Sequence, residues 1–188
     1  MHITRITLAI ILSMLLYGCA DWSEMPTDSQ LISIFNAKRS SFEQTAETVW
    51  QSNCDMYYTS NGYGPDSLLA ADDSLLYAFL KAYSPRLDSL VEETRCLWIG
   101  FHAPEKGKPD AGVAEDTCVE FTYYCKAFTS FGLYKNIIYS KTPPHSELIE
   151  GKDLNEVFFA RHDSDSYKLV DIYKPIDKNW YIRIQYFP

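Results

Sequence analysis

Residues 117–128, Thr-Cys-Val-Glu-Phe-Thr-Tyr-Tyr-Cys-Lys-Ala-Phe, decide the fold. Side chains in this segment alternate between two sets: Val119, Phe121, Tyr123 and Cys125 in one, and Cys118, Glu120, Thr122 and Tyr124 in the other. Successive side chains of a strand point to opposite faces of a sheet, so a period of two predicts a β-strand with one face against a core.

The period of two begins near residue 96 and returns in several segments up to the end of the chain. It predicts an antiparallel sheet of about five strands, over residues 96–102, 117–128, 134–140, 167–174 and 180–187. The segments between them are polar and rich in proline, glycine and aspartate. They predict a loop over residues 103–116, an irregular segment over residues 145–166 that could include one short turn of helix, and a turn near residues 177–179.

Before residue 96 apolar residues recur every three or four positions, which predicts helices over about residues 28–51, 66–82 and 85–94. Thr27 and Gln30 are spaced as a capping box before the first helix. Residues 52–65 contain turn-forming residues and predict a loop. Helices followed by strands, without alternation, predict an α+β fold. We expect one domain over residues 27–188, with the helices packed on one face of the sheet.

The first residues have the composition of an export signal. The apolar run from Ile6 to Leu16 is shorter than the roughly 20 residues that span a bilayer as a helix, and it suits the centre of a secretory signal peptide. Leu16-Tyr17-Gly18-Cys19 resembles the lipobox of bacterial lipoproteins, although Tyr17 stands where that motif has a small residue. The resemblance implies cleavage of residues 1–18 by signal peptidase II and a lipid, such as palmitate, on Cys19.

Two consequences follow from this resemblance. Residues 19–26 would form a short tether that keeps the domain close to its membrane. Ala20 follows the cysteine, and by analogy with lipoprotein sorting we expect the periplasmic side of the outer membrane. Scattered positions elsewhere, among them Pro26-Thr27-Asp28, Tyr139-Ser140-Lys141 and Tyr173-Lys174, are similar to a group of small uncharacterised bacterial lipoproteins. That similarity implies the same location and fold, and no activity.

The charge of the chain limits its partners. The net charge is −8, and removal of the leader, which carries one arginine and no acid, makes it −9. An acidic chain without a basic cluster is not expected to bind nucleic acid or anionic lipid headgroups. Attachment to the membrane would therefore depend on the lipid on Cys19. The acidic residues form a solvated surface or a face for a basic partner.

Four cysteines remain after Cys19, and an even number in an exported chain favours disulfides. If the predicted strands over residues 96–102 and 117–128 pair with each other, the midpoint of the pairing lies near residue 110. Cys96 then lies almost opposite Cys125. We therefore favour a Cys96–Cys125 disulfide, which leaves Cys54 for Cys118. Buried thiols are the alternative. A metal site is disfavoured because the spacing lacks a C-x-x-C pair.

No catalytic motif stands out in the sequence, so we assign no catalytic residue, metal ligand or cofactor. His102 and His145 are isolated in the sequence, and residues 162–165 are expected to form a solvated loop. Several carboxylates could still converge for glycosidic chemistry, namely Glu115, Asp116, Glu120 and Glu156.

Three tyrosines alternate with the apolar residues of their predicted strands and are therefore expected on the other face of the sheet: Tyr124, Tyr173 and Tyr181. They predict either a surface for a partner or a second layer of cross-strand pairs. The function we expect is that of a non-enzymatic envelope lipoprotein that binds another protein, for example an immunity protein that neutralises an incoming toxin. The alternatives are a hydrolase of cell-wall glycan or peptide, and an assembly or structural factor of the envelope.

Overall fold

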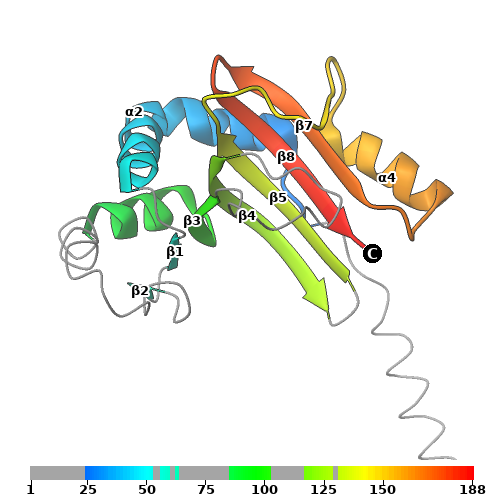
Figure 1. The fold of residues 1–188 in the computed structure, drawn as a ribbon, viewed down its shortest axis with the longest axis horizontal. Coiled ribbons are helices and arrows are strands. Elements are labelled where there is room, and N and C mark those ends of the chain that lie inside the picture. Colours follow the sequence, from blue (N-terminus) through cyan, green and yellow to red (C-terminus); the bar gives the residue numbers. More distant parts are fainter. Residues whose placement is uncertain (1–23, 53–55, 60–61, 64–84, 103–116, 129–130) are drawn as a thin grey trace, which may run out of the picture.

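The structure is a computed structural model that describes residues 24–52, 56–59, 62–63, 85–102, 117–128 and 131–188 (Figure 1). The leader with Cys19, Cys54, the predicted helix over residues 66–82 and the predicted loop over residues 103–116 lie outside the described residues.

A single sheet dominates the described part of the chain. Its spatial order is β2-β1-β3-β4-β5-β8-β7-β6, and every neighbouring pair is antiparallel except β6 and β7. The strands are β1 (Met56–Thr59), β2 (Gly62–Tyr63), β3 (Trp98–His102), β4 (Cys118–Phe128), β5 (Phe131–Tyr139), β6 (Glu147–Leu148), β7 (Val170–Asp177) and β8 (Trp180–Phe187).

The α+β class is as predicted, but the sheet is larger than the five strands expected. Six strands have four or more residues, and the two-residue strands β2 and β6 form the edges. The prediction of a loop over residues 52–65 was wrong, because β1 and β2 form there and β1 pairs with β3. The predicted pairing of β3 with β4 is confirmed. Trp98 lies opposite Thr122 and Phe101 lies opposite Val119, so the midpoint of the pairing is residue 110, as predicted.

Three helices are described: α2 (Asp28–Ser52), a helix over residues 85–94, and α4 (Leu154–Ser164). The first two agree with the predicted bounds. Thr27 and Gln30 form the predicted capping box, because the Thr27 N–H donates to Gln30 Oε1 (2.7 Å) and the Gln30 N–H to Thr27 Oγ1 (3.3 Å). The segment over residues 145–166 was predicted to be irregular with at most a short turn of helix, but α4 has 11 residues, so helices are not confined to the N-terminal part.

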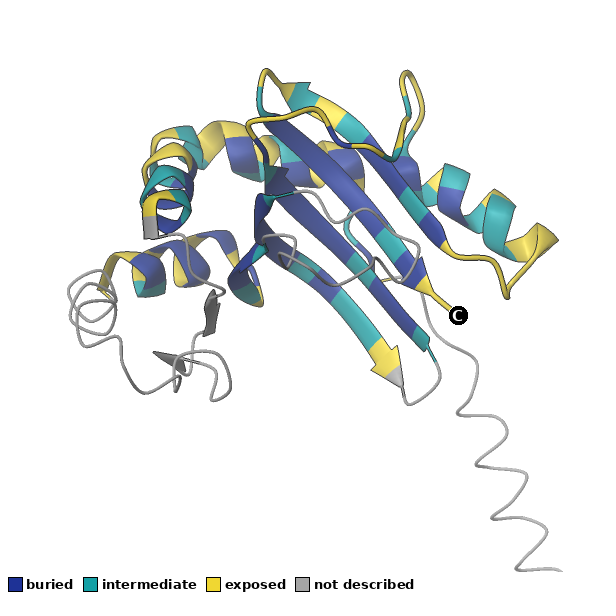
Figure 2. Ribbon diagram, in the orientation of Figure 1, coloured by how far each residue is buried: buried dark blue, intermediate teal, exposed yellow. Residues whose placement is uncertain are grey.

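The helices pack on the same face of the sheet, where they form one core (Figures 1 and 2). Aromatic rings join α2 to the strands: Phe42 lies 4.8 Å from Phe121 and Phe35 lies 4.9 Å from Trp180, measured between ring centroids. Each of these side chains is almost fully buried, and burial of a phenylalanine contributes about 2–3 kcal/mol. This face of the sheet therefore forms the core that stabilises the fold.

A β-bulge in β4 changes which residues face the helices. The register between β4 and β5 shifts between Thr122 and Tyr124. Phe121 pairs with Ile137 before the bulge and Tyr124 pairs with Lys135 after it, so both Phe121 and Tyr124 face the helices. Cys125 consequently lies on the opposite face. Tyr123, the inserted residue, packs on the helix side as predicted, so the predicted alternation is correct up to Tyr123 and reversed from Tyr124 onwards.

Candidate functional site

The candidate site lies on the sheet face opposite the three described helices, which we call the outer face. Alternate residues of β3, β4, β5, β8 and β7 build it, because every second side chain of these strands points away from the core. One end is an apolar cluster, the middle carries charged side chains, and the other end carries aromatic rings.

The charged group is centred on Arg183 of β8. Its Nε and Nη2 donate to Asp171 Oδ1 (2.8 Å) and Oδ2 (3.1 Å), and its Nη1 donates to Glu120 Oε1 (2.9 Å). His102 Nε2 lies 3.1 Å from the other oxygen of Glu120. The Arg183 and Glu120 side chains are each 10% exposed. The structure therefore brings together two residues that the sequence singled out separately, His102 and Glu120.

The ionisation of Glu120 indicates what this group can do. Burial raises the pKa of Glu120, but His102 and Arg183 lower it by more, so that the net pKa lies below its ordinary value. A general acid for glycosidic chemistry needs a raised pKa instead. The carboxylate is held charged as the partner of Arg183, which is the behaviour of a structural ion pair.

Two of the three tyrosines predicted as a partner surface meet on the outer face. Tyr173 and Tyr181 form an edge-to-face pair with centroids 6.4 Å apart, in a cluster with Cys118 and Ile138. Their exposed fractions are only 3% and 7%, which is expected of cross-strand pairs, the alternative to a partner surface. Tyr124 lies on the helix-facing side because of the bulge, so the structure does not bring the three tyrosines together.

An aromatic strip crosses the other end of the outer face and consists of Trp98, Tyr134 and Phe187. Tyr134 of β5 lies 6.5 Å from Trp98 of β3 and 6.4 Å from Phe187 of β8, both in edge-to-face geometry. Trp98 and Tyr134 are half-buried and Phe187 is exposed. The sequence contained a signal for this strip that we did not use, because these residues alternate with core positions on their strands.

The predicted Cys96–Cys125 disulfide is not present, and the Cys54–Cys118 pairing stays a prediction. Cys96, Cys118 and Cys125 are present as thiols, and Cys54 lies outside the described residues. Cys96 belongs to the core on the helix side, whereas the bulge puts Cys125 on the outer face, so a Cys96–Cys125 bond would have to pass through the sheet. Burial raises the pKa of Cys96 to about 11.

The remaining candidates are dispersed. His145 is exposed, Glu156 is exposed on α4, and His162 lies in the last turn of α4 rather than in a loop, in contact with the Tyr186 ring. Glu115 and Asp116 are among the residues that the structure does not describe. Within the described ranges, no group of three or more His, Cys, Asp or Glu side chains could hold a metal ion.

A separate cavity of about 330 Å³ opens between α2 and the β7–β8 turn. Its lining is acidic and aromatic: Glu43, Glu47, Tyr139, Asp177, Lys178, Asn179 and Trp180. Lys141 binds Glu47 at 3.2 Å and Arg39 binds Asp177. Since these carboxylates already have cationic partners, we assign the cavity no role.

Together these features define an α+β domain whose sheet is covered by helices on one side and carries a buried charged group and an aromatic strip on the other. The sequence model of the family described as "Domain of unknown function (DUF4948)" matches residues 24–187, so the chain belongs to this family. No curated protein and no solved structure matches the chain. None of the helices in the described part is long and apolar enough to cross a membrane.

Proposed function

We propose that the protein is a membrane-anchored envelope lipoprotein that binds another protein through the aromatic strip and has no catalytic activity of its own. The aromatic strip is the observation that carries the proposal. Aromatic side chains in a partly exposed row supply large contact areas at little cost in side-chain entropy, and they are enriched among the residues that dominate binding energies. The anchor would be the lipid on Cys19, on the periplasmic side of the outer membrane.

The charged group beside the strip supports binding over catalysis. Glu120 and Asp171 both have Arg183 as a partner, and the pKa of Glu120 lies below its ordinary value, so Glu120 is held as a charged partner rather than as a general acid. Such a buried network fixes the positions of neighbouring side chains. Its role would be to hold β4, β7 and β8 so that the strip presents a rigid surface.

The net charge of −8 favours a basic protein as the partner, because opposite charges accelerate encounter and disfavour other partners. A toxin-neutralising immunity protein is the most concrete version of this function. An assembly or structural factor of the envelope would use the same surface for a resident partner. Deletion of the gene distinguishes the two: loss of an immunity protein sensitises cells to toxin from their siblings, whereas loss of an assembly factor alters the envelope without any toxin.

Binding through the strip can be tested with one substitution and a matched control. Phe187 and Leu148 are exposed apolar side chains on β8 and β6, with exposed fractions of 37% and 46%. We expect F187A to weaken binding of the full chain to its envelope partner at least tenfold, and L148A to leave it unchanged. Equal binding by both variants, measured by titration against the captured partner, would contradict the proposed surface.

The anchor requires a separate experiment. Cells that express the full chain and are supplied with labelled palmitate should incorporate the label into the wild type and not into the C19A variant. The wild type should also fractionate with membranes, and the variant should be soluble in the periplasm. Label on the variant would show that Cys19 is not the acylated residue.

A hydrolase of cell-wall glycan or peptide is the rival function, and the contact of His102 with Glu120 is the observation that favours it. The test is incubation of the purified chain with isolated cell wall, followed by chromatography of the released fragments. Fragments that appear with the wild type and disappear with H102A would replace the binding proposal by an enzymatic one.

A further inference from the structure

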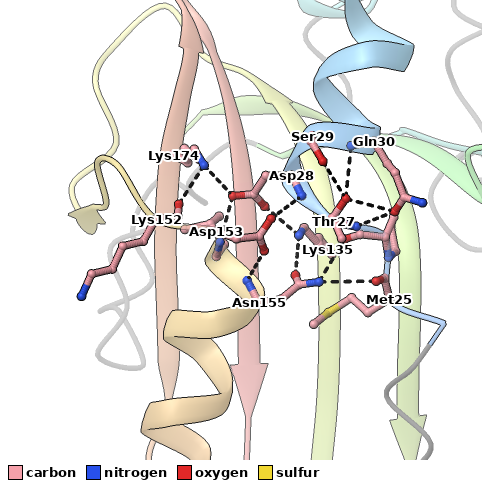
Figure 3. A network of polar contacts seen from close by, with 12 residues as sticks. Met25, Thr27, Asp28, Ser29, Gln30, Lys135, Lys152, Asp153, Asn155 and Lys174 are labelled. Atoms are coloured by element: carbon pink, nitrogen blue, oxygen red, sulfur yellow. Dashed lines mark hydrogen bonds and ion pairs between the residues drawn. The ribbon is translucent and has the colours of Figure 1, made fainter.

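A buried lysine meets an asparagine and an aspartate at the point where α2, β5 and α4 converge (Figure 3). The Lys135 side chain is 0% exposed and that of Asp28 is 2% exposed. Lys135 Nζ donates to Asp28 Oδ1 at 2.7 Å and is also in contact with Asn155 Oδ1. The amine of Lys135 is therefore in contact with both a carboxylate and a carboxamide.

The surroundings hold these groups in place. Asn155 Nδ2 donates to the carbonyls of Pro26 (3.3 Å) and Met25 (3.4 Å), which lie at the entrance of the chain into the domain. Asp28 Oδ2 accepts from Lys174 Nζ (3.0 Å) and from the Leu154 N–H (2.8 Å). Each side chain is thus positioned by at least one contact outside the Lys135–Asn155 pair.

We propose that Lys135 and Asn155 react in the folded protein to form an intramolecular isopeptide bond, with Asp28 as the proton carrier. The inference does not depend on the proposed function. It concerns a modification of the chain itself, and it requires no cofactor or oxidant.

The reaction balances with ammonia as the only product released. Asp28 takes a proton from the Lys135 ammonium group, and the neutral Nζ then attacks Cγ of Asn155. Asp28 then returns the proton to Nδ2, the bond between Cγ and Nδ2 breaks, and Nδ2 leaves as ammonia. Nζ loses a second proton, which Asp28 accepts. An amide between Nζ and Cγ remains.

The environment of Lys135 favours the two conditions that this chemistry needs, a neutral amine and the exclusion of water. A lysine is a nucleophile only as the neutral amine, and burial favours that form. Burial lowers the pKa of Lys135, and although Asp28 raises it in part, the net pKa lies below its ordinary value. The neighbours of Lys135 on the helix-facing side of the sheet are the buried residues Tyr124, Leu133, Ile137 and Ile184, which exclude water and so protect the product from hydrolysis.

The bond would tie the centre of the sheet to the start of α4. Because Asn155 also contacts the Met25 and Pro26 carbonyls, the link lies beside the segment through which any anchor at the N-terminal end would pull on the domain. A covalent bond at that point would keep α4 attached to β5 when the noncovalent contacts around it open.

Peptide mapping of the full chain tests the proposal directly. Heat denaturation followed by trypsin should release residues 127–141 joined to residues 153–161, because a lysine in amide linkage is not cleaved. The mass of this branched peptide should equal the sum of the two peptides less one ammonia. Separate peptides over residues 127–135, 136–141 and 153–161 would show an ordinary ion pair and overturn the proposal.

Three variants test which side chains the reaction requires. K135R keeps a positive charge beside Asp28 but cannot form the bond, so the branched peptide should be absent while circular dichroism remains that of a folded chain. D28N should reduce the linked fraction at least tenfold at equal times after refolding. K168Q is the matched control: Lys168 is an exposed lysine that is not among the contacts of Asp28, Lys135 or Asn155, and the linked fraction should stay unchanged. If K135R and D28N do not fold, the peptide map of the wild type still decides the question.

Discussion

Asp28 and Asp153 each accept a hydrogen bond from the first backbone N–H group of the other's helix. Asp153 Oδ2 accepts from the Asp28 N–H (2.9 Å), and Asp28 Oδ2 accepts from the Leu154 N–H (2.8 Å). Both acids also lie at the positive ends of the helix dipoles. Since α4 has only 11 residues, a length that is marginal for an isolated helix, its formation depends on a residue more than a hundred positions earlier in the chain.

Replacement of Asp153 by alanine should lower the free energy of unfolding by about 1–2 kcal/mol, because the N–H groups of Asp28 and Asn155 both lose their acceptor. Chemical denaturation measures the change. Asp163, an exposed aspartate near the other end of α4, is the control, and D163A should stay within about 0.5 kcal/mol of the wild type. Equal losses in the two variants would mean that the reciprocal caps contribute nothing.

Replacement of Arg183 by methionine should cost about 3–5 kcal/mol of stability, because it leaves Glu120 and Asp171 buried without their cation. Adding E120Q and D171N to R183M removes the stranded charges and should recover part of the loss. The comparison uses denaturant midpoints at constant ionic strength. A loss of under 1 kcal/mol in R183M would show that water reaches these carboxylates.

The dependence of stability on pH should report Glu120. Its pKa is lowered on folding, so its contribution is complete above the ordinary value of 4.5 and is lost as the pH falls through the lower folded value. Between pH 7 and pH 3 the free energy of unfolding should therefore fall more steeply for the wild type than for E120Q, which should be the less stable protein at pH 7. Parallel acid limbs, measured by urea unfolding, would contradict the assignment.

The sequence predicted those elements whose signal is local. The pairing of β3 with β4 followed from the loop centre at residue 110, and it already places His102 and Glu120 diagonally on the same face. The helix α2 was predictable from its apolar spacing and its capping box. These features needed no knowledge of distant parts of the chain.

The features that were missed depend on distant residues or on one inserted residue. Only Leu154 and Phe158 of α4 are buried, so its pattern is weak, and its first N–H group is capped by Asp28. The bulge at Thr122/Tyr124 reverses the alternation in the rest of β4, from Tyr124 to Phe128. This reversal explains why Cys125 does not lie beside Cys96.

The accessibility of the cysteines should follow the bulge as well. Cys125 is half-buried on the outer face, whereas Cys96 and Cys118 are each 3% exposed, and burial raises the pKa of Cys96 to about 11. Iodoacetamide should therefore modify Cys125 of the native protein well before Cys96 or Cys118, as measured by peptide mapping over time. Protection of both Cys96 and Cys125 until a reductant is added would restore the predicted disulfide.

The geometry of the aromatic strip should depend on Gly132. A Cβ atom at this position would lie 2.9 Å from Cε2 of Tyr134, so the ring of Tyr134 packs directly on the glycine. G132A should displace that ring and weaken partner binding through the strip, while the free energy of unfolding falls by about 1 kcal/mol. Y134F keeps the ring in place and should bind normally.

A double-mutant cycle separates this steric effect from a general weakening of β5. Removal of the ring in Y134A leaves nothing for the alanine at position 132 to displace. The stability cost of G132A should therefore be smaller in the Y134A background than in the wild type, a nonadditivity expected of residues in direct contact. Additive costs would show that Gly132 is required by the backbone of β5 rather than by the Tyr134 ring, and the strip would then not depend on it.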